Sequence, residues 1–155
     1  MKRVAIPNFL RINLGQYTDF DTVQNISKAN DLVKLSQYQQ ALDVLSHIIN
    51  SNNEQAGAIA RLYSGFIYIA LRDSKKGYDL WRDGINDKAP LAQLFHETRL
   101  AVKEFPQSKA CFVFMQMLVN YIANDQYCRQ LCGEIVNRAS SDTAKLSQSL
   151  PDTRD

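Results

Sequence analysis

The sequence predicts an all-α protein of antiparallel helix pairs, with about seven helices in a single domain. Apolar residues recur at helical spacing along most of the chain, and no alternating strand pattern competes with them in the central region. Only four prolines and six glycines occur, mostly where a helix should begin or end. With 155 residues and a hydrophobic content of 45%, the chain can bury one core.

Capping residues and breaks divide the chain into its predicted helices. Asp21 or Thr22 opens the first helix, and the last residue of "NSNN" (50–53) can cap the third. Pro90 suits the first turn of the fifth helix because its missing N–H has no helical partner there, and Pro106 ends that helix. The predicted ranges are about 21–35, 38–50, 54–72, 74–86, 90–105, 108–124 and 126–138.

Two flanking segments complete the predicted organisation around a helical domain of residues 21–139. Residues 1–20 contain too many apolar side chains for a solvated tail, so we expect them to pack on the domain or on a neighbouring subunit. These side chains are Val4, Ile6, Phe9, Leu10, Ile12 and Leu14. Residues 140–155, "SSDTAKLSQSLPDTRD", have too little apolar material to order themselves and are expected to form a disordered polar tail.

The third and sixth predicted helices are apolar almost all the way round. A helix on the outside of a bundle would show a wide polar face. These two helices should therefore be sandwiched between others, or should present a second apolar face to a ligand. Their only strongly polar side chains are Arg61 and Ser64 in 56–71, and Gln116 and Asn120 in 110–123.

A shift of 36 residues superimposes the first predicted helix pair on the second. Each unit is a helix, a tight turn and a helix, with a small residue in each helix where the two backbones must approach. A period in the thirties made of antiparallel helix pairs is typical of stacked helical repeats. The matched positions are Ala29 and Gly65, Leu32 and Tyr68, Ala41 and Gly77, Leu45 and Trp81, and Ile49 and Ile85.

These positions resemble the tetratricopeptide repeat over roughly residues 21–88. That family has a small residue and an aromatic one in its first helix, then a small, a bulky and a small residue in its second. Gly65, Tyr68, Gly77, Trp81 and Gly84 meet all five places, while Ala29, Leu32, Ala41 and Leu45 meet four and the large Ile48 departs. The resemblance implies a right-handed superhelical stack. A third unit departs further, with Gln130 and Glu134 at a small and a bulky position.

A narrower resemblance is to small tetratricopeptide-like chaperones and accessory proteins of bacterial type III secretion systems. It rests on the length, the plan of the chain and the region "FPQSKACFVFMQMLVNYIANDQYCRQLCGEIVN" (105–137). That region has a proline-led helix, an Asn-Asp turn and a last amphipathic helix. The resemblance implies a chaperone or adaptor for a secretion subunit.

The sequence predicts neither an enzyme nor a metal or cofactor site. His47 and His96 lack a second histidine or a carboxylate at metal-binding spacing. Cys128 and Cys132 could offer two thiolates from one helix face, but a structural zinc site needs four ligands and no nearby Cys or His pair supplies the rest, so partly buried small apolar positions are the favoured interpretation. Glycine-rich phosphate loops and nucleophile elbows are absent from the sequence.

Charge and cysteine content indicate a cytoplasmic protein without a nucleic-acid or membrane partner. The net charge is +2, and no apolar run approaches the roughly 20 residues that a bilayer requires. The opening "MKRVAIPNFLRINLG" lacks the unbroken apolar region of a signal peptide, and the three cysteines are expected to be thiols.

The favoured function is therefore that of a protein-binding module. By the tetratricopeptide resemblance, the first helix of each pair lines a concave groove that suits an amphipathic helix or an extended apolar peptide. The residues implied are Val23, Ile26, Asn30, Val33, Ile59, Leu62, Phe66 and Ile69. The alternative for these residues is burial beneath the fifth helix or the N-terminal segment.

Two other function classes remain open. The first is a self-associating structural component that uses its apolar faces to form a homodimer. A helix-turn-helix nucleic-acid binder is a distant third, because "QAGAIARLYSGFI" (55–67) has the right rhythm but almost no basic residue to reach a phosphate.

Overall fold

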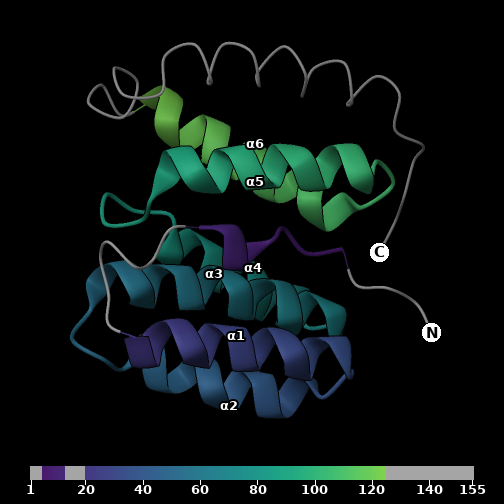
Figure 1. The fold of residues 1–155 in the computed structure, drawn as a ribbon. Coiled ribbons are helices and arrows are strands. Elements are labelled where there is room, and N and C mark those ends of the chain that lie inside the picture. Colours follow the sequence, from purple (N-terminus) through teal and green to yellow (C-terminus); the bar gives the residue numbers. More distant parts are fainter. Residues whose placement is uncertain (1–4, 13–19, 125–155) are drawn as a thin grey trace. The chain divides into compact units, whose positions relative to one another are not determined.

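The structure is a computed structural model that describes residues 5–12 and 20–124. This part of the chain contains α-helices and one short 3-10 helix, without a β-strand, so the predicted all-α class is confirmed (Figure 1). The elements are η1 (Phe9–Arg11), α1 (Phe20–Lys34), α2 (Tyr38–Ile49), α3 (Glu54–Ala70), α4 (Ser74–Gly84), α5 (Leu91–Glu104) and α6 (Lys109–Asn124). The predicted helix at 126–138, the predicted tail, Cys128 and Cys132 lie outside the described residues.

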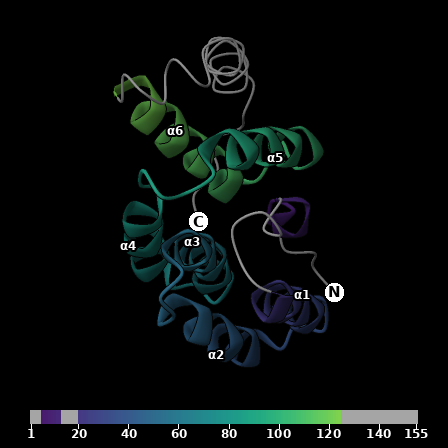
Figure 2. The same cartoon turned by 60° about the vertical axis from the view of Figure 1, so that its left-hand side comes forward.

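The chain divides into two compact units where the sequence led us to expect one domain. One unit comprises residues 9–90, with η1 and α1 to α4, and the other combines residues 1–8 with 91–155. In the first unit α1 packs on α2, α2 on α3 and α3 on α4, as Figure 2 shows from a second direction. In the second unit α5 packs on α6. The boundary follows Pro90, which directly precedes α5.

The six α-helices of the described residues begin and end within about two residues of the predicted positions. The side-chain oxygen of Asn53 accepts a hydrogen bond from the N–H of Ala56 at 3.0 Å, which satisfies one of the donors that the start of α3 leaves unpaired. Asp73 caps α4 in the same way.

The turn between α1 and α2 is a Schellman motif. The N–H of Ser36 donates to the carbonyl of Val33 at 2.9 Å, and the N–H of Gln37 donates to the carbonyl of Leu32 at 2.8 Å. Ser36 has a left-handed φ of 59°. These two bonds satisfy carbonyls at the end of α1 and reverse the chain within three residues.

The turn between α3 and α4 repeats this motif. The N–H of Arg72 donates to the carbonyl of Ile69 at 2.9 Å, and the N–H of Asp73 donates to that of Tyr68 at 2.8 Å. Arg72 has a left-handed φ of 67°. Each participating residue lies 36 positions after its counterpart in the first turn, so the period found in the sequence is also present in the backbone hydrogen bonds.

The α3–α4 pair crosses at Gly65 and Gly77, as predicted. A Cβ atom added at Gly65 would lie 2.8 Å from the carbonyl oxygen of Gly77 and 2.5 Å from Cδ1 of Trp81. A Cβ atom added at Gly77 would lie 2.6 Å from the carbonyl oxygen of Gly65. All three distances are below those that real Cβ atoms tolerate. The corresponding residues of the first pair, Ala29 and Ala41, are both fully buried.

Trp81 fills the space beside this crossing and is fully buried. Its indole N–H donates to the carbonyl of Leu62 at 3.0 Å, so the polar edge of the ring is satisfied inside the core. The ring packs against Phe66 at a centroid distance of 4.6 Å and against Tyr78 at 5.4 Å. The bulky position of the repeat is therefore a core position.

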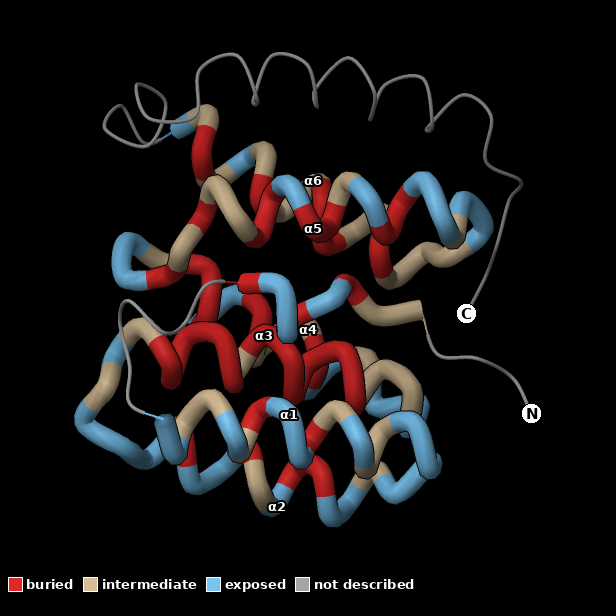
Figure 3. The backbone as a smooth tube through the Cα atoms, viewed as in Figure 1, coloured by how far each residue is buried: buried red, intermediate tan, exposed pale blue. Residues whose placement is uncertain are grey.

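Burial differs sharply among the helices of the first unit. Figure 3 shows α3 buried along most of its length, whereas α1 and α2 alternate between buried and exposed residues. Helix α3 is thus the central element of this unit. Of the two alternatives that the sequence left for this helix, a sandwiched position or a second apolar face for a ligand, its eleven buried residues between Ala56 and Ile67 favour the sandwiched position.

Gly65→Ala should destabilise the first unit by about 1–3 kcal/mol, because the methyl group must displace the Gly77 backbone or the Trp81 ring. Gly57→Ala is the matched control, because a Cβ atom there would be crowded by the flexible end of Arg61 at 3.2 Å, while the carbonyl oxygens of Ile49 and Ile48 lie at ordinary contact distances; this variant should gain up to about 1 kcal/mol from helix propensity. Urea unfolding followed by the fluorescence of the chain's single tryptophan measures both changes. If Gly65→Ala and Gly57→Ala were equally stable, the close approach of the two backbones at Gly65 and Gly77 would be contradicted.

Arg72→Gly should be more stable than Arg72→Ala by about 1 kcal/mol, because glycine adopts the left-handed φ of this turn without strain. The alanine variant controls for loss of the exposed arginine side chain while it retains the strained backbone. Thermal unfolding of the two variants provides the comparison. A higher melting temperature for the alanine variant would rule out the left-handed turn.

Candidate functional site

The eight residues predicted to line a groove lie on α1 and α3, but they differ in exposure. Those on α3 are mostly interior: Ile59 and Leu62 are fully buried, and Phe66 is 2% exposed. The partly exposed members are Val23, Asn30 and Val33 on α1 and Ile69 near the end of α3, while Ile26 is buried.

The N-terminal segment covers part of the α3 face. Phe9 is 2% exposed and stacks on Tyr63 with ring centroids 4.8 Å apart and an interplanar angle of 12°. Its ring also meets Phe66 edge-on at 6.0 Å. Ile12 is buried as well, and η1 packs against α1. The predicted binding face is therefore occupied by the chain's own residues.

This occupation corrects the expectation of an open groove. Ile59, Leu62 and Phe66 are not accessible to a partner in this conformation, because η1 and the neighbouring helices of the first unit surround α3. Burial by the N-terminal segment was one of the two alternatives that the sequence left open. The feature of the sequence that indicated this burial was the pair of apolar residues Phe9 and Ile12, which lie three residues apart after Pro7.

The aromatic face of α3 is fixed by contacts that do not involve the N-terminal segment. The hydroxyl of Tyr63 donates to Oδ1 of Asn30 at 3.3 Å and joins α3 to α1. Burial, with a smaller contribution from the charge of Asp31, raises the pKa of Tyr63 well above its ordinary value, so the phenol is neutral at physiological pH. The ring of Phe66 packs against the ring of Trp81.

In the second unit, residues 5–8 pack with α5 and α6. The thiol of Cys111, which is fully buried in α6, donates to the carbonyl of Ala5 at 3.4 Å. Burial raises the pKa of this thiol to about 11, although a hydrogen bond with Ser108 lowers it. A neutral, buried thiol is a poor nucleophile, and Cys111 packs in the interior of the second unit.

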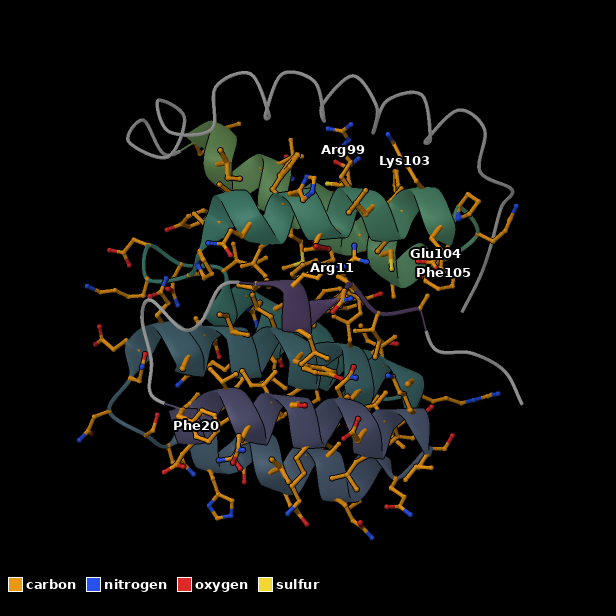
Figure 4. All side chains as sticks on the ribbon, in the orientation of Figure 1. Arg11, Phe20, Arg99, Lys103, Glu104 and Phe105 are labelled. Atoms are coloured by element: carbon orange, nitrogen blue, oxygen red, sulfur yellow. The ribbon has the colours of Figure 1, made fainter. Side chains whose placement is uncertain are left out.

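Large apolar side chains are also exposed away from the α3 face. Phe20, at the start of α1, is 72% exposed and projects outward in Figure 4. Leu35 and Leu71 are 64% and 43% exposed, and they occupy equivalent positions just before the left-handed residues of the two Schellman turns. Leu10 and Leu100 complete this group. These are scattered single side chains, which are ordinary on protein surfaces.

Metal-binding side chains, histidines and membrane-spanning helices are the other features that could indicate a function within the described residues. Within 5–12 and 20–124, no group of three or more His, Cys, Asp or Glu side chains could hold a metal ion. His47 and His96 are exposed. None of the helices in this part of the chain combines the length and the apolar character needed to cross a bilayer.

Comparison of the chain with protein-family models, with curated proteins and with solved structures found no significant match.

Leu62→Asp should abolish folding of the first unit rather than selectively remove a binding activity, because it places a charge in a fully buried position at a cost above about 4 kcal/mol. Leu71→Asp is the control, since that side chain at the end of the same helix is 43% exposed and should change stability by less than about 0.5 kcal/mol. A far-ultraviolet spectrum and a thermal melt distinguish the two. If the Leu62→Asp protein folded cooperatively, Leu62 would have to be accessible, as the open-groove interpretation requires.

Raising the pH from 8 to 10.5 should destabilise the wild-type protein by about 2 kcal/mol more than Cys111→Ala. The folded-state pKa of Cys111 lies above its ordinary value of 9.0, so the stability that this thiol contributes is complete below pH 9 and is lost as the pH rises toward 11. Urea titrations of both proteins at the two pH values measure the difference. The Tyr63 phenol makes the same pH-dependent contribution to stability in both proteins, so its contribution cancels in the comparison. Identical pH dependence would contradict the burial of the thiol.

Proposed function

We propose that the chain is a non-enzymatic protein-binding module, a chaperone or adaptor that holds an amphipathic helix or an apolar peptide of a partner protein. The observation that carries this proposal is the repeated helical hairpin. The pairs α1–α2 and α3–α4 share a turn geometry and a period of 36 residues, and their small residues at equivalent positions, Ala29 and Gly65, and Ala41 and Gly77, are buried. Stacked helical pairs of this kind offer extended surfaces for protein recognition rather than a catalytic centre.

The way in which α3 is covered supports the same proposal. A three-residue turn of the chain lies on the aromatic face of α3 and contacts it mainly through one phenylalanine side chain. This contact uses an aromatic anchor on a helical surface, which is a common mode of peptide recognition. The described surface also has mixed charges, as in the exposed pair of Lys88 and Glu54, and shows no basic stripe for nucleic acid.

The partner proposed here is a protein in the same compartment, which we take to be the cytoplasm. The resemblance to accessory proteins of type III secretion directs the first search to subunits of such an apparatus. Recognition would involve the partly exposed members of the predicted set, Val23, Asn30, Val33 and Ile69.

Affinity capture with the tagged full chain from its native host, followed by binding of the purified partner in vitro, tests this function. Val33→Asp should lower the affinity for the purified partner at least tenfold. It should not unfold the protein, because the Val33 side chain is only partly buried. Ser46→Asp adds the same charge to the exposed face of α2 and should bind normally. Capture of no specific protein, or equal binding by both variants, would contradict the proposal.

A further inference from the structure

We propose that residues 9–12 are an internal ligand: they occupy a peptide site on the α1–α3 face, and a partner segment with an aromatic side chain competes with Phe9 for that site. This inference rests on the proposed function, because it identifies the chemistry of the ligand and how access to the site is controlled. The site consists of the ring of Tyr63, the ring of Phe66 and the adjoining side of α1.

The segment has the character of a bound peptide. It forms one 3-10 turn, Phe9–Arg11, and the N–H of Ile12 donates to the carbonyl of Phe9 at 3.4 Å, which is long for a backbone hydrogen bond. Two side chains three residues apart, Phe9 and Ile12, are buried, while Leu10 between them is 43% exposed and Arg11 is exposed. An anchor at each end of one turn is how a short amphipathic segment binds to a helical surface.

The surface beneath the segment is held in place without it. Tyr63 is tied to Asn30 through its hydroxyl, and Phe66 is supported by Trp81, whose indole is bonded to the backbone of α3. None of these contacts involves residues 9–12. The aromatic surface would therefore persist if Phe9 moved away, as a preformed binding site requires.

Covalent attachment explains why the site is filled. The segment is joined to α1 through only residues 13–19, and a short tether gives an attached ligand an effective concentration in the millimolar range. A free partner peptide displaces the segment when the ratio of its concentration to its dissociation constant exceeds the ratio of this effective concentration to the segment's own dissociation constant. The internal ligand thus sets an affinity threshold for partners.

Binding of a fluorescein-labelled peptide of residues 7–12, "PNFLRI", to the full-length protein tests the proposal. The Phe9→Ser protein should bind this peptide at least tenfold more tightly than wild type, because its own segment no longer competes. Leu10→Ser alters an exposed side chain of the same segment and should behave as wild type. The control peptide "PNSLRI" should not bind the Phe9→Ser protein.

A folded Phe9→Ser protein that does not bind the peptide, or that binds it no better than wild type, would overturn the proposal. Loss of folding in Phe9→Ser would also overturn it, because an internal ligand is not needed to fold the surface that it covers. Phe9→Leu keeps an apolar anchor and should show a smaller gain of the same sign. The assay needs no external partner, so its failure is distinct from failure of the capture experiment that tests the protein-binding function.

Discussion

The approach of two backbones at Gly65 and Gly77 is the constraint on which the first unit depends. The backbone carbonyl of each glycine occupies the space that a Cβ atom on the other glycine would need. Helices α3 and α4 can therefore lie close enough for Trp81 to pack against α3. At that distance the indole N–H reaches the carbonyl of Leu62. A wider crossing would leave the indole nitrogen buried without a partner, at a cost of about 1–3 kcal/mol.

From this crossing the aromatic layer extends outward through the unit. Trp81 supports Phe66, Phe66 meets Phe9, and Phe9 stacks on Tyr63, which is bonded to Asn30 of α1. The layer thus links α4, α3, the N-terminal segment and α1. Phe9 is the one member of this layer that belongs to a three-residue 3-10 turn and not to an α-helix, which is why we assign it the role of a replaceable ligand.

Much of the fold could be predicted because its determinants are local. Periodicity located six helices, Asn53 showed where α3 begins, and the spacing of small residues identified the α3–α4 crossing. The turn at Ser36 could be located as a break, but its left-handed backbone could not, because serine carries no signal for that conformation.

The candidate site was less accessible to sequence reasoning. Periodicity identified Ile59, Leu62 and Phe66 as one apolar face, yet the same pattern suits an open groove and a buried core. What decides between them is the packing of Phe9, a contact between residues far apart in the chain that no local spacing encodes. The division into two compact units after Pro90 likewise depends on which helices pack together, which no local pattern encodes.

The most direct test of this account is a nuclear Overhauser measurement between the α-protons of Gly65 and Gly77 in the assigned, isotope-labelled protein. The structure requires their backbones to be in contact, so a strong cross-peak is expected between two glycines on different helices. Assigned resonances for both glycines without that cross-peak would contradict the crossing and the aromatic layer built upon it.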